Sequence, residues 1–476
     1  MAKILQPDLC VIGGGSGGLT VAAAALSLGA SVVLVERDKM GGDCLNYGCV
    51  PSKSLIASAK RAQYMRTATK FGIAAEDPKI NFGRVNEHVH RVIADIAPHD
   101  SVERFEGLGA TVLQGEAKFT DAKTVMVGDQ AVKPRRFVIA TGSRPMSPPI
   151  PGLSEIEYHT NETIFNLTRK PQHLIVVGGG PIGMEMAQAH HRLGSDVTVL
   201  EMQTPLANDD PELSDIALKQ IRREGVVIRQ GVKVTQVGQK AKNIAVTIEL
   251  KNGDTEEIVG SHLLLAAGRK PNVEALDLEK AKVNYDGRGI QVNKSLKTSN
   301  KRIYAIGDVA GGLQFTHVAG YHGGLVVRNA LYRLPIKNDP TIIPWATYTD
   351  PEIANVGLTE ADAREKYGDK FKVLRWSFAE NDRARAEHVE EGLLKVITTP
   401  SGKILGAGAV GNNAGELINI YALAVANKMK VGAFTKMVAP YPTQFEIAKR
   451  IAVEFYKDKV DHPALKFLLQ LNRILG

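Results

Sequence analysis

The chain has 476 residues, of which 44% are hydrophobic and 23% are charged, and its formal net charge is +8. A chain of this length and composition is expected to form two to four domains around substantial cores. Its 59 basic residues are interspersed with 51 acidic ones and form no block of five like charges, which argues against a nucleic-acid-binding protein.

The N-terminal residues MAKILQPDLCVIGGG lead directly into a strand and a glycine turn, which leaves no room for a signal peptide. No window approaches the roughly 20 apolar residues that span a bilayer. Three cysteines are too few for a disulfide scaffold. We therefore expect a cytoplasmic protein without a membrane span.

The first predicted element is a buried strand that ends in a G-x-G-x-x-G turn, LCVIGGGSGG at 9–18. The turn leads into a predicted helix over 19–30 and a second strand over 31–36, which ends in Glu36. Such a turn lets the backbone approach a pyrophosphate at a helix N-terminus, and the terminal carboxylate can bind ribose hydroxyls. The three glycines of the motif are Gly13, Gly15 and Gly18.

Two cysteines follow in GGDCLNYGC, with four residues between Cys44 and Cys49. In a reducing compartment such a close pair indicates a redox-active or metal-binding site. Zinc usually takes four ligands, which this chain does not offer in paired spacing. A helix is predicted directly afterwards, VPSKSLIASAKRAQ, and its positive end together with Lys53 favours a thiolate. The third cysteine, Cys10, lies mid-strand and is expected in the core.

The strand–turn–helix–strand pattern recurs in LIVVGGGPIG at 174–183, followed by a helix over 184–195 and a strand over 196–201. Glu36 lies 18 residues after the third glycine of the first turn, and Glu201 lies 18 residues after that of the second. A further repeat pairs FVIATGSRP at 137–145 with LLLAAGRKP at 263–271. Two dinucleotides in one chain imply electron transfer between a tightly held carrier and an exchangeable donor. The glycines of the second turn are Gly178, Gly180 and Gly183.

With these motifs the chain resembles the class I pyridine nucleotide-disulfide oxidoreductases, which include dihydrolipoamide dehydrogenase, glutathione reductase and mercuric reductase. The resemblance also covers GGDCLNYGCVPSKSL, YAIGDVAG at 304–311 and TDPEIANVGLTE at 349–360. It implies an α/β fold with two Rossmann-like dinucleotide-binding domains, glutathione reductase-like, and an α+β C-terminal dimerisation domain. The implied divisions are an FAD-binding domain at 1–150 and 273–338, an NAD(P)-binding domain at 151–272 and an interface domain at 339–476 of a homodimer.

The resemblance also assigns residues. It implies that Cys49 faces the flavin, that Cys44 meets the acceptor by thiol–disulfide exchange, and that Lys53 pairs with Glu185. Hydride would pass from the nicotinamide to the flavin, and electrons would pass on to Cys49. The implied FAD contacts are Gly13, Gly15, Gly18, Glu36, Gly42, Lys53, Ala117, Thr141, Gly142, Ser143, Asp308, Gln314 and His317. The implied NAD contacts are Gly178, Gly180, Ile182, Gly183, Glu201, Val232 and Gly268.

The second turn predicts which nicotinamide is used. Glu201 would accept hydrogen bonds from a free 2′-hydroxyl and repel a 2′-phosphate. Met202 and Gln203, which follow, carry no positive charge. We predict NADH rather than NADPH.

The chain departs from the disulfide reductase pattern near its C-terminus, in APYPTQFEIAKR at 439–450. Tyr441 stands where those relatives have an acid–base histidine, while Glu446 matches. An unperturbed phenol has a pKa near ~10 and is a poor base at neutral pH. We expect His322 and His462 to lie at the surface and not to replace that histidine.

The acceptor therefore stays open. Mercuric reductases carry tyrosine at this position, but they end in a vicinal cysteine pair, which LLQLNRILG lacks. The leading prediction is a disulfide or another small acceptor. The alternatives are reduction of a metal ion of the Hg(II) type at the same thiols, which are suited to a soft metal, or a flavin redox sensor without turnover.

The tail HPALKFLLQLNRILG has a broad apolar helical face, formed by Leu465, Leu468, Leu469, Leu471, Ile474 and Leu475. We expect this helix to pack within the protein's own dimer, because apolar stripes usually serve packing. The alternative is a helix that lies in a membrane interface.

Overall fold

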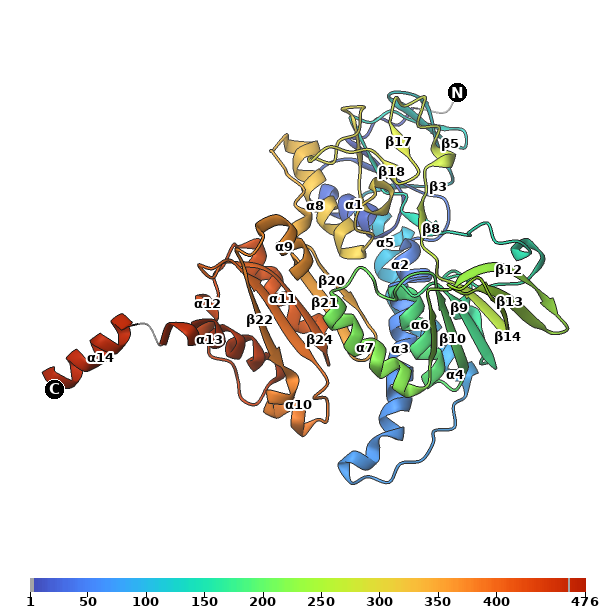
Figure 1. Ribbon diagram of the computed structural model, residues 1–476. Helices are drawn as coiled ribbons and strands as arrows, with labels where there is room; N and C mark the ends of the chain where they lie inside the picture. The colour runs from blue at the N-terminus through green and yellow to red at the C-terminus, as the bar shows by residue number, and fades with distance from the viewer. Residues whose placement is uncertain (1–3, 461–462) are drawn as a thin grey trace. The chain divides into compact units, whose positions relative to one another are not determined.

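The computed structural model describes residues 4–460 and 463–476 (Figure 1). The chain forms two compact units. The first contains the chain up to Arg66, Ala75–Met202 and Ile228–Pro340, and the second contains Thr67–Ala74, Gln203–Val227 and the chain from Thr341.

The first unit contains a five-stranded parallel sheet built on the first glycine turn. The strand order is β19 (Ile303–Ala305), β7 (Arg136–Ile139), β1 (Leu9–Ile12), β2 (Val32–Glu36) and β3 (Thr111–Gln114). Helix α1 (Ser16–Ser27) connects β1 to β2 and packs against α8 (Thr316–Tyr332). This helix begins inside the glycine motif, three residues before the predicted start, because Gly17 and Gly18 form its first turn.

The second glycine turn builds a second sheet in the same unit. The order is β11 (Val227–Gln230), β10 (Asp196–Glu201), β9 (His173–Val177) and β15 (His262–Leu265), and α6 (Pro181–Arg192) connects β9 to β10. Strand β9 pairs in parallel with β10 and β15, as β1 pairs with β2 and β7. The duplication predicted from sequence is therefore also a duplication of topology, and the α/β fold class is confirmed.

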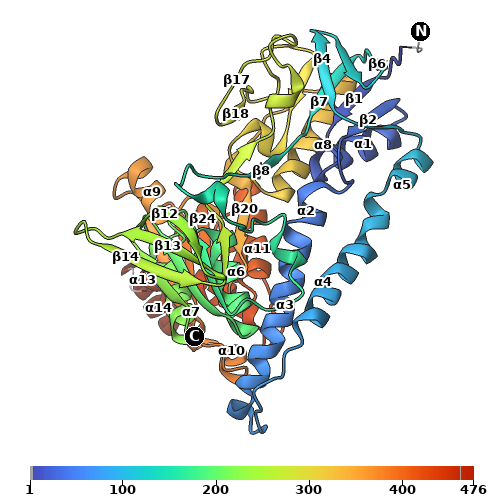
Figure 2. The same ribbon diagram turned by 90° about the vertical axis from the view of Figure 1, so that its right-hand side faces the viewer.

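Each copy also carries a three-stranded antiparallel sheet before its last parallel strand. The first is formed by β4 (Ala117–Asp121), β5 (Thr124–Val127) and β6 (Gln130–Val132). The second, seen in Figure 2, is formed by β12 (Lys233–Lys240), β13 (Asn243–Glu249) and β14 (Thr255–Gly260). A ribbon of β8 (Ser143–Pro145) and β16 (Arg269–Pro271) then pairs the chain just after β7 with the chain just after β15.

The cysteine segment forms helices in the first unit. Cys44 lies on α2 (Gly42–Asn46), and Cys49 is the first residue of α3 (Cys49–Arg66). Figure 2 shows α3 beside α4 (Phe82–Ile96), and the two helices are in contact. The other elements of this unit are α5 (Val102–Gly107), β17 (Tyr285–Asp286) and β18 (Gly289–Ile290).

The second unit is built on a five-stranded antiparallel sheet. Its order is β20 (Pro344–Thr347), β21 (Glu352–Gly357), β24 (Ile404–Gly411), β23 (Leu393–Thr398) and β22 (Lys372–Ser377). Its core includes Phe378, Tyr421 and Phe455. The helices of this unit are α7 (Pro211–Glu224), α9 (Glu360–Tyr367), α10 (Asp382–Ala386), α11 (Ala414–Ala426), α12 (Gly432–Thr435), α13 (Ile447–Val460) and α14 (Pro463–Leu475).

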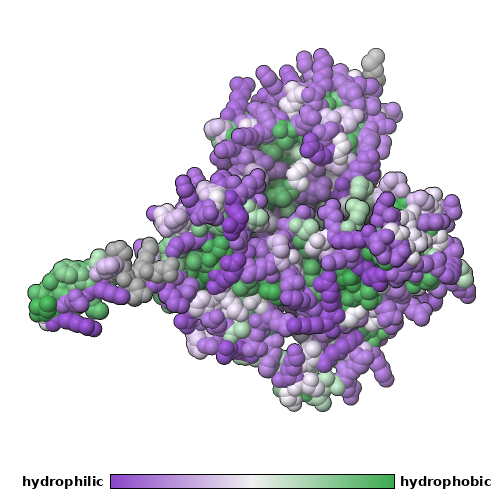
Figure 3. Space-filling model, in the orientation of Figure 1, coloured by the Kyte–Doolittle hydropathy of each residue, from purple (hydrophilic) through white to green (hydrophobic). Residues whose placement is uncertain are grey.

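Within the described residues, no helix combines the length and the apolarity that a bilayer crossing requires. Helix α14 is nevertheless two-sided: Figure 3 shows apolar residues along one side of this segment and hydrophilic residues along the other.

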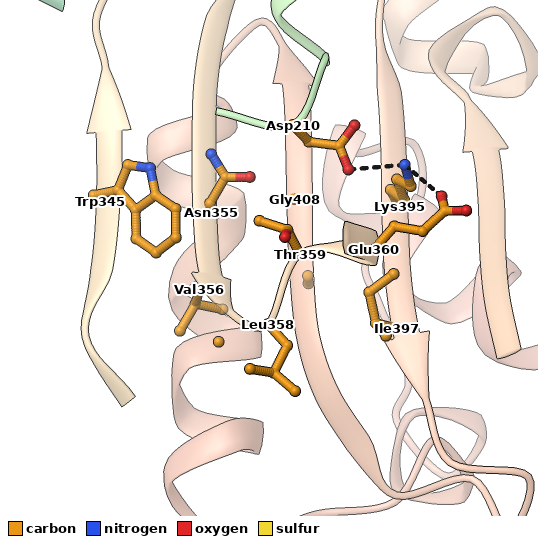
Figure 4. A pocket seen from close by; sticks show the side chains of 12 residues that line it. Asp210, Trp345, Asn355, Val356, Leu358, Thr359, Glu360, Lys395, Ile397 and Gly408 are labelled. Atoms are coloured by element: carbon orange, nitrogen blue, oxygen red, sulfur yellow. Dashed lines mark hydrogen bonds and ion pairs between the residues drawn. The ribbon is translucent and has the colours of Figure 1, made fainter. Parts of the chain in front are cut away.

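A buried lysine joins α7 to the sheet of the second unit (Figure 4). Lys395 on β23 is only 4% exposed, and its Nζ lies 2.8 Å from Asp210, 2.9 Å from Glu212 and 2.8 Å from Glu360. Arg375 on β22 binds Glu212 and Glu360 as well. Burial opposes ionisation of Glu212, but hydrogen bonds from Arg375 and Lys395 outweigh it and lower the pKa of this carboxyl. The hydrogen bond from Lys395 likewise lowers the pKa of Glu360.

We predict that Lys395→Met destabilises the second unit by about 3–5 kcal/mol, because it leaves three carboxylates without their shared cation. Stabilisation by carboxyls with lowered pKa is present above the ordinary pKa of about 4.5 and is lost as the pH falls through the folded values. The difference between wild type and variant should therefore narrow below about pH 4.5 in thermal unfolding. Lys370→Met, at an exposed site, is the control, and equal stability of the two variants would contradict the prediction.

Candidate active site

The two glycine turns have the same steric requirements. A Cβ on Gly18 would lie 1.8 Å from the carbonyl oxygen of Gly13, and one on Gly183 would lie 2.0 Å from that of Gly178. Gly13 and Gly178 have φ near +112° and +111°, a region that favours glycine. These positions need glycine for the fold of the turn itself.

The middle glycines serve a different purpose. A Cβ on Gly15 would meet nothing closer than 3.8 Å, and one on Gly180 would meet nothing within 4 Å. Both residues are the N-caps of their helices, α1 and α6, and as glycines they have no side chain to accept a hydrogen bond from the N–H groups of the first helical turn. The open space lies at the positive end of each helix, which fits the pyrophosphate of a dinucleotide.

The two glutamates lie beside these turns. Oε2 of Glu36 accepts a hydrogen bond from the N–H of Gly14 at 2.5 Å, and Oε2 of Glu201 accepts one from Gly179 at 2.6 Å. The carboxylates are thereby held at the carboxyl ends of β2 and β10, where ribose hydroxyls are bound in dinucleotide folds. The equal sequence spacing of the two glutamates from their glycine turns therefore corresponds to the same hydrogen bond in each copy.

The cysteine helix approaches the first turn closely. Gly41 and Gly42 have φ of +84° and +59°, and a Cβ on Gly42 would lie 2.7 Å from the Cα of Gly15. Gly42 is therefore required for the contact between α2 and the first turn. This contact holds Cys44 near the place where the first dinucleotide would bind.

Cys44 and Cys49 shift each other's pKa in opposite directions in the reduced state. The hydrogen bond between the two sulfurs lowers the pKa of Cys49 to about 6, with help from Thr316 and the positive charge of Lys53. The same hydrogen bond, together with burial, raises the pKa of Cys44. Of the two sulfurs, Cys49 is therefore the one that loses its proton more readily. By contrast, burial raises the pKa of the core residue Cys10 to about 12.

The expected pair of Lys53 and Glu185 is present, with Nζ 2.8 Å from Oε2. Lys53 lies one helical turn after Cys49 on α3, and Glu185 lies on α6 just after the second glycine turn. Glu185 is buried, so its charge needs this partner. The positive charge lowers the pKa of Cys49 and the negative charge raises it.

A second polar network joins the cysteine helix to the acid of the YAIGDVAG motif. Arg269 Nη2 lies 3.2 Å from Asp43, the residue before Cys44, and its Nε donates to Ser143 Oγ at 2.7 Å. Ser143 Oγ donates in turn to Asp308 at 2.6 Å. Burial raises the pKa of Asp308, and the hydrogen bond from Ser143 opposes this. Asn161 donates to Asp43 from the other side at 3.0 Å.

The remaining candidates lie in their expected segments of the first unit. Thr141 Oγ1 donates to the carbonyl of Asn272 at 2.8 Å, and Gly142 and Gly268 have positive φ. Val232 donates its N–H to the carbonyl of Glu201 at 3.1 Å. Ala117 is buried, Gln314 half-buried, and Ile182 and His317 exposed, the last stacked on Phe315.

Several residues of this site were missed by sequence reasoning. Thr316 Oγ1 lies 3.6 Å from Cys49 Sγ, although only its neighbour His317 was singled out. Arg269, Asp43 and Asn161 were not predicted either. Two of them lie next to predicted site residues in the sequence, since Arg269 follows Gly268 and Asp43 precedes Cys44.

His322 corrects an expectation. It is buried rather than exposed, on the face of α8 that packs into the unit, and its Nδ1 accepts from the N–H of Gly307 at 3.3 Å. Burial lowers its pKa, so it is a neutral packing residue. His462 lies outside the described residues.

Tyr441 and Glu446 belong to the second unit. Tyr441 is 69% exposed, and its hydroxyl donates to Asp382 at 3.0 Å. This hydrogen bond and the negative charge raise the pKa of the phenol, so that still less of it is deprotonated and able to act as a base near neutral pH. Glu446 forms an ion pair with Arg450 at 2.8 Å.

Comparison with known proteins agrees with this arrangement. Residues 7–323 match the pyridine nucleotide-disulphide oxidoreductase family, and residues 343–452 match the dimerisation domain of that family. A mercuric reductase from Staphylococcus aureus is 36% identical over 455 residues, covering 95% of this chain and 83% of that protein. A dihydrolipoyl dehydrogenase from Thermus scotoductus is 35% identical over 464 residues, covering 95% and 98%.

A solved structure of an HOCl-induced flavoprotein disulfide reductase, RclA from Escherichia coli, superposes with a TM-score of 0.83 at 26% identity. The match covers 94% of this chain and 99% of that one. A related structure of the same protein is described as a Cu(II) complex.

The chain belongs to the class I pyridine nucleotide-disulfide oxidoreductases. It is a flavin disulfide oxidoreductase of the mercuric reductase and dihydrolipoyl dehydrogenase type, and the dimerisation domain supports a homodimer. The family implies FAD and a pyridine nucleotide, and the two open glycine turns with their paired glutamates fit two dinucleotides. In the part of the chain that the structure describes, no three His, Cys, Asp or Glu side chains form a metal cluster.

We predict that Cys49 in the reduced protein reacts with iodoacetamide with a pH midpoint near 6, since only the thiolate attacks. Lys53→Met should move this midpoint upward, and Glu185→Gln should move it downward. Cys44→Ala should raise it as well, because the sulfur hydrogen bond is lost. Mass spectrometry of the Cys49 peptide measures the rate at each pH. A midpoint near 9 in the wild type would contradict the assignment.

Proposed function

We propose that this protein is an FAD-dependent, NADH-oxidising reductase that passes electrons through the Cys44–Cys49 pair to a disulfide or another small acceptor. The observation that carries the proposal is the position of Cys49 at the start of α3, one helical turn before the Lys53–Glu185 ion pair and 3.6 Å from Thr316, with Cys44 on the adjacent helix α2. We assign FAD to the domain at 1–150 and 273–338, NADH to 151–272 and the dimer interface to 339–476. A reducing, cytoplasmic compartment suits this chemistry.

Bound FAD would accept a hydride from the nicotinamide and hand the electron pair to the disulfide. The residues of this chain would then complete the reaction. As its proton leaves, the sulfur of Cys44 attacks an acceptor disulfide, forms a mixed disulfide and releases one thiolate. The thiolate of Cys49 attacks the sulfur of Cys44, restores the internal disulfide and releases the second thiolate. The proton of Cys44 leaves on one of the two product thiols.

The residues around the pair have positioning roles in this proposal. Lys53 keeps Cys49 ionised, and Glu185 keeps the charge of Lys53 in place. Arg269 binds Asp43 and Ser143, and so fixes the helix of Cys44 relative to Asp308. In the family dimer, Tyr441 of the second protomer would face Cys44, with Glu446 behind it.

Metal-ion reduction is the second candidate function, and the phenol of Tyr441 favours it. Neither Cys44 nor Tyr441 loses its proton readily near neutral pH, so base-assisted disulfide exchange is slow. A soft metal ion displaces the thiol proton itself when it binds sulfur. The balanced reaction would be NADH + Hg(II) → NAD⁺ + H⁺ + Hg(0). Relatives named mercuric reductase, and the Cu(II) complex of RclA, support this alternative.

The proposal is tested by anaerobic addition of NADH to the purified flavoprotein. A long-wavelength absorption between the Cys49 thiolate and the flavin should appear, and it should bleach as the pH falls below about 6. Cys49→Ser should abolish the band while FAD stays bound. Cys44→Ser, the matched control, should keep a thiolate next to the flavin. No band in the wild type would overturn the proposal.

The two acceptor classes are separated by NADH consumption with small disulfides or with Hg(II) under excess thiol. Turnover with disulfides that is lost in Cys44→Ser supports the leading proposal. Turnover with Hg(II) alone supports the second.

We predict that kcat/KM for NADH exceeds that for NADPH by at least about tenfold, a difference of roughly 1.4 kcal/mol. The carboxylate of Glu201 would repel a 2′-phosphate. Glu201→Gln should narrow the ratio, mainly by improving NADPH. Asp196→Asn, at the exposed start of the same strand, is the control and should leave the ratio unchanged. A clear NADPH preference in the wild type would contradict the prediction.

A further inference from the structure

The last helix has a feature that the redox chemistry does not use. None of the residues of α14 is buried in the chain. Its large apolar side chains are 39% to 81% exposed: Leu465, Phe467, Leu468, Leu469, Leu471, Ile474 and Leu475. The helix also begins beyond residue 452, where the match to the dimerisation domain ends. It is therefore an addition to the part of the chain that the family model describes.

The apolar face is unusually wide. At 3.6 residues per turn, the apolar side chains of α14 occupy roughly two-thirds of its circumference, interrupted only by Asn472. A helix that packs on one protein surface shows an apolar stripe of at least about 100°, and the apolar arc of α14 is well above that minimum. Partial immersion in an apolar medium covers a wider arc than contact with a single surface does.

The remaining strip carries only positive charge. It consists of Lys466, Gln470 and Arg473, and residues 463–476 contain no acidic side chain. Elsewhere in the chain the basic residues are nearly balanced by acids. A cationic strip beside an apolar face is complementary to the phosphates and acyl chains of an anionic lipid surface.

The length of the helix decides how it would meet the lipid. Thirteen residues are fewer than the roughly 20 that cross a bilayer, so α14 would lie in the plane of the interface. A second copy of the chain is the other occupant that would cover the apolar residues, and the test below distinguishes it from a lipid surface.

We propose that α14 binds an anionic lipid surface, with its apolar arc in the headgroup–acyl boundary and with Lys466 and Arg473 on lipid phosphates. The attachment is reversible and depends both on the apolar area that is buried and on attraction to anionic lipids. It would place a reductase with its two redox thiols at a membrane surface.

The test is co-sedimentation of the full-length flavoprotein with vesicles of phosphatidylcholine, with or without phosphatidylglycerol. Binding should increase with the content of phosphatidylglycerol and should weaken at 1 M salt, where the Debye length is about 3 Å. Lys466→Gln/Arg473→Gln should weaken binding about 25-fold, since each charge contributes about fivefold near such a surface. Phe467→Glu/Leu471→Glu should abolish it.

The control variants are Gln470→Ala in the same strip and Lys370→Gln/Lys436→Gln, which removes two exposed charges outside α14. Both should bind as the wild type does, and all variants should oxidise NADH normally, which shows that they are folded. Absence of vesicle binding, or binding that the α14 variants leave unchanged, would overturn the proposal. So would a loss of the dimer in Phe467→Glu/Leu471→Glu, measured by sedimentation velocity, because the apolar arc would then be covered by a second copy.

Discussion

The chemistry of this protein depends on the interaction between the neighbouring thiols of Cys44 and Cys49. The hydrogen bond between the sulfurs divides two equivalent thiols into an ionised one and a neutral one. Lys53 strengthens the division and Glu185 limits it, since the two charges act on Cys49 in opposite directions. A lysine alone would lower the pKa further and make the thiolate a weaker nucleophile. The buried ion pair therefore tunes the sulfur rather than merely filling the space between α3 and α6.

The duplicated glycine turns explain how this pair is held in place. In each copy the third glycine is required by a contact within the turn and the first by its positive φ and by a carbonyl outside the turn, whereas the middle glycine leaves space for a ligand. Gly42 brings the cysteine helix against the first turn, and Glu185 follows directly after the second. The sulfurs are thus connected to both dinucleotide turns by short segments of chain and by one ion pair. The duplicated glycine-turn unit would therefore bring the nicotinamide donor, the flavin and the two thiols together.

Local patterns in the sequence were sufficient for the fold and for part of the site. The strands before each turn, the helices after them and the two glutamates follow from spacing, because the βαβ unit has a fixed length. The contacts that join distant segments could not be found in this way. Thr316 and Cys49 are 267 positions apart, and Lys395 and Asp210 are 185 apart. His322 was misjudged for a related reason, since a single polar residue does not reveal which face of its helix is covered.

One segment that the motifs place in the second dinucleotide-binding domain belongs to the second unit in the structure. Residues 203–227, which lie between two strands of the second dinucleotide sheet in sequence, group with the dimerisation sheet in space. The buried Lys395 explains this, because Asp210 and Glu212 on α7 bind it from that segment. The pattern of apolar and polar residues does not predict such a cluster, because a lysine within a strand ordinarily faces solvent.

The central claim is that the two sulfurs store an electron pair in addition to the flavin. Anaerobic reductive titration with dithionite measures this directly, as electrons taken up per bound FAD. The account predicts about four electrons for the wild type, two for the flavin and two for the disulfide, and about two for Cys44→Ser. Uptake of only two electrons by the wild type would contradict it.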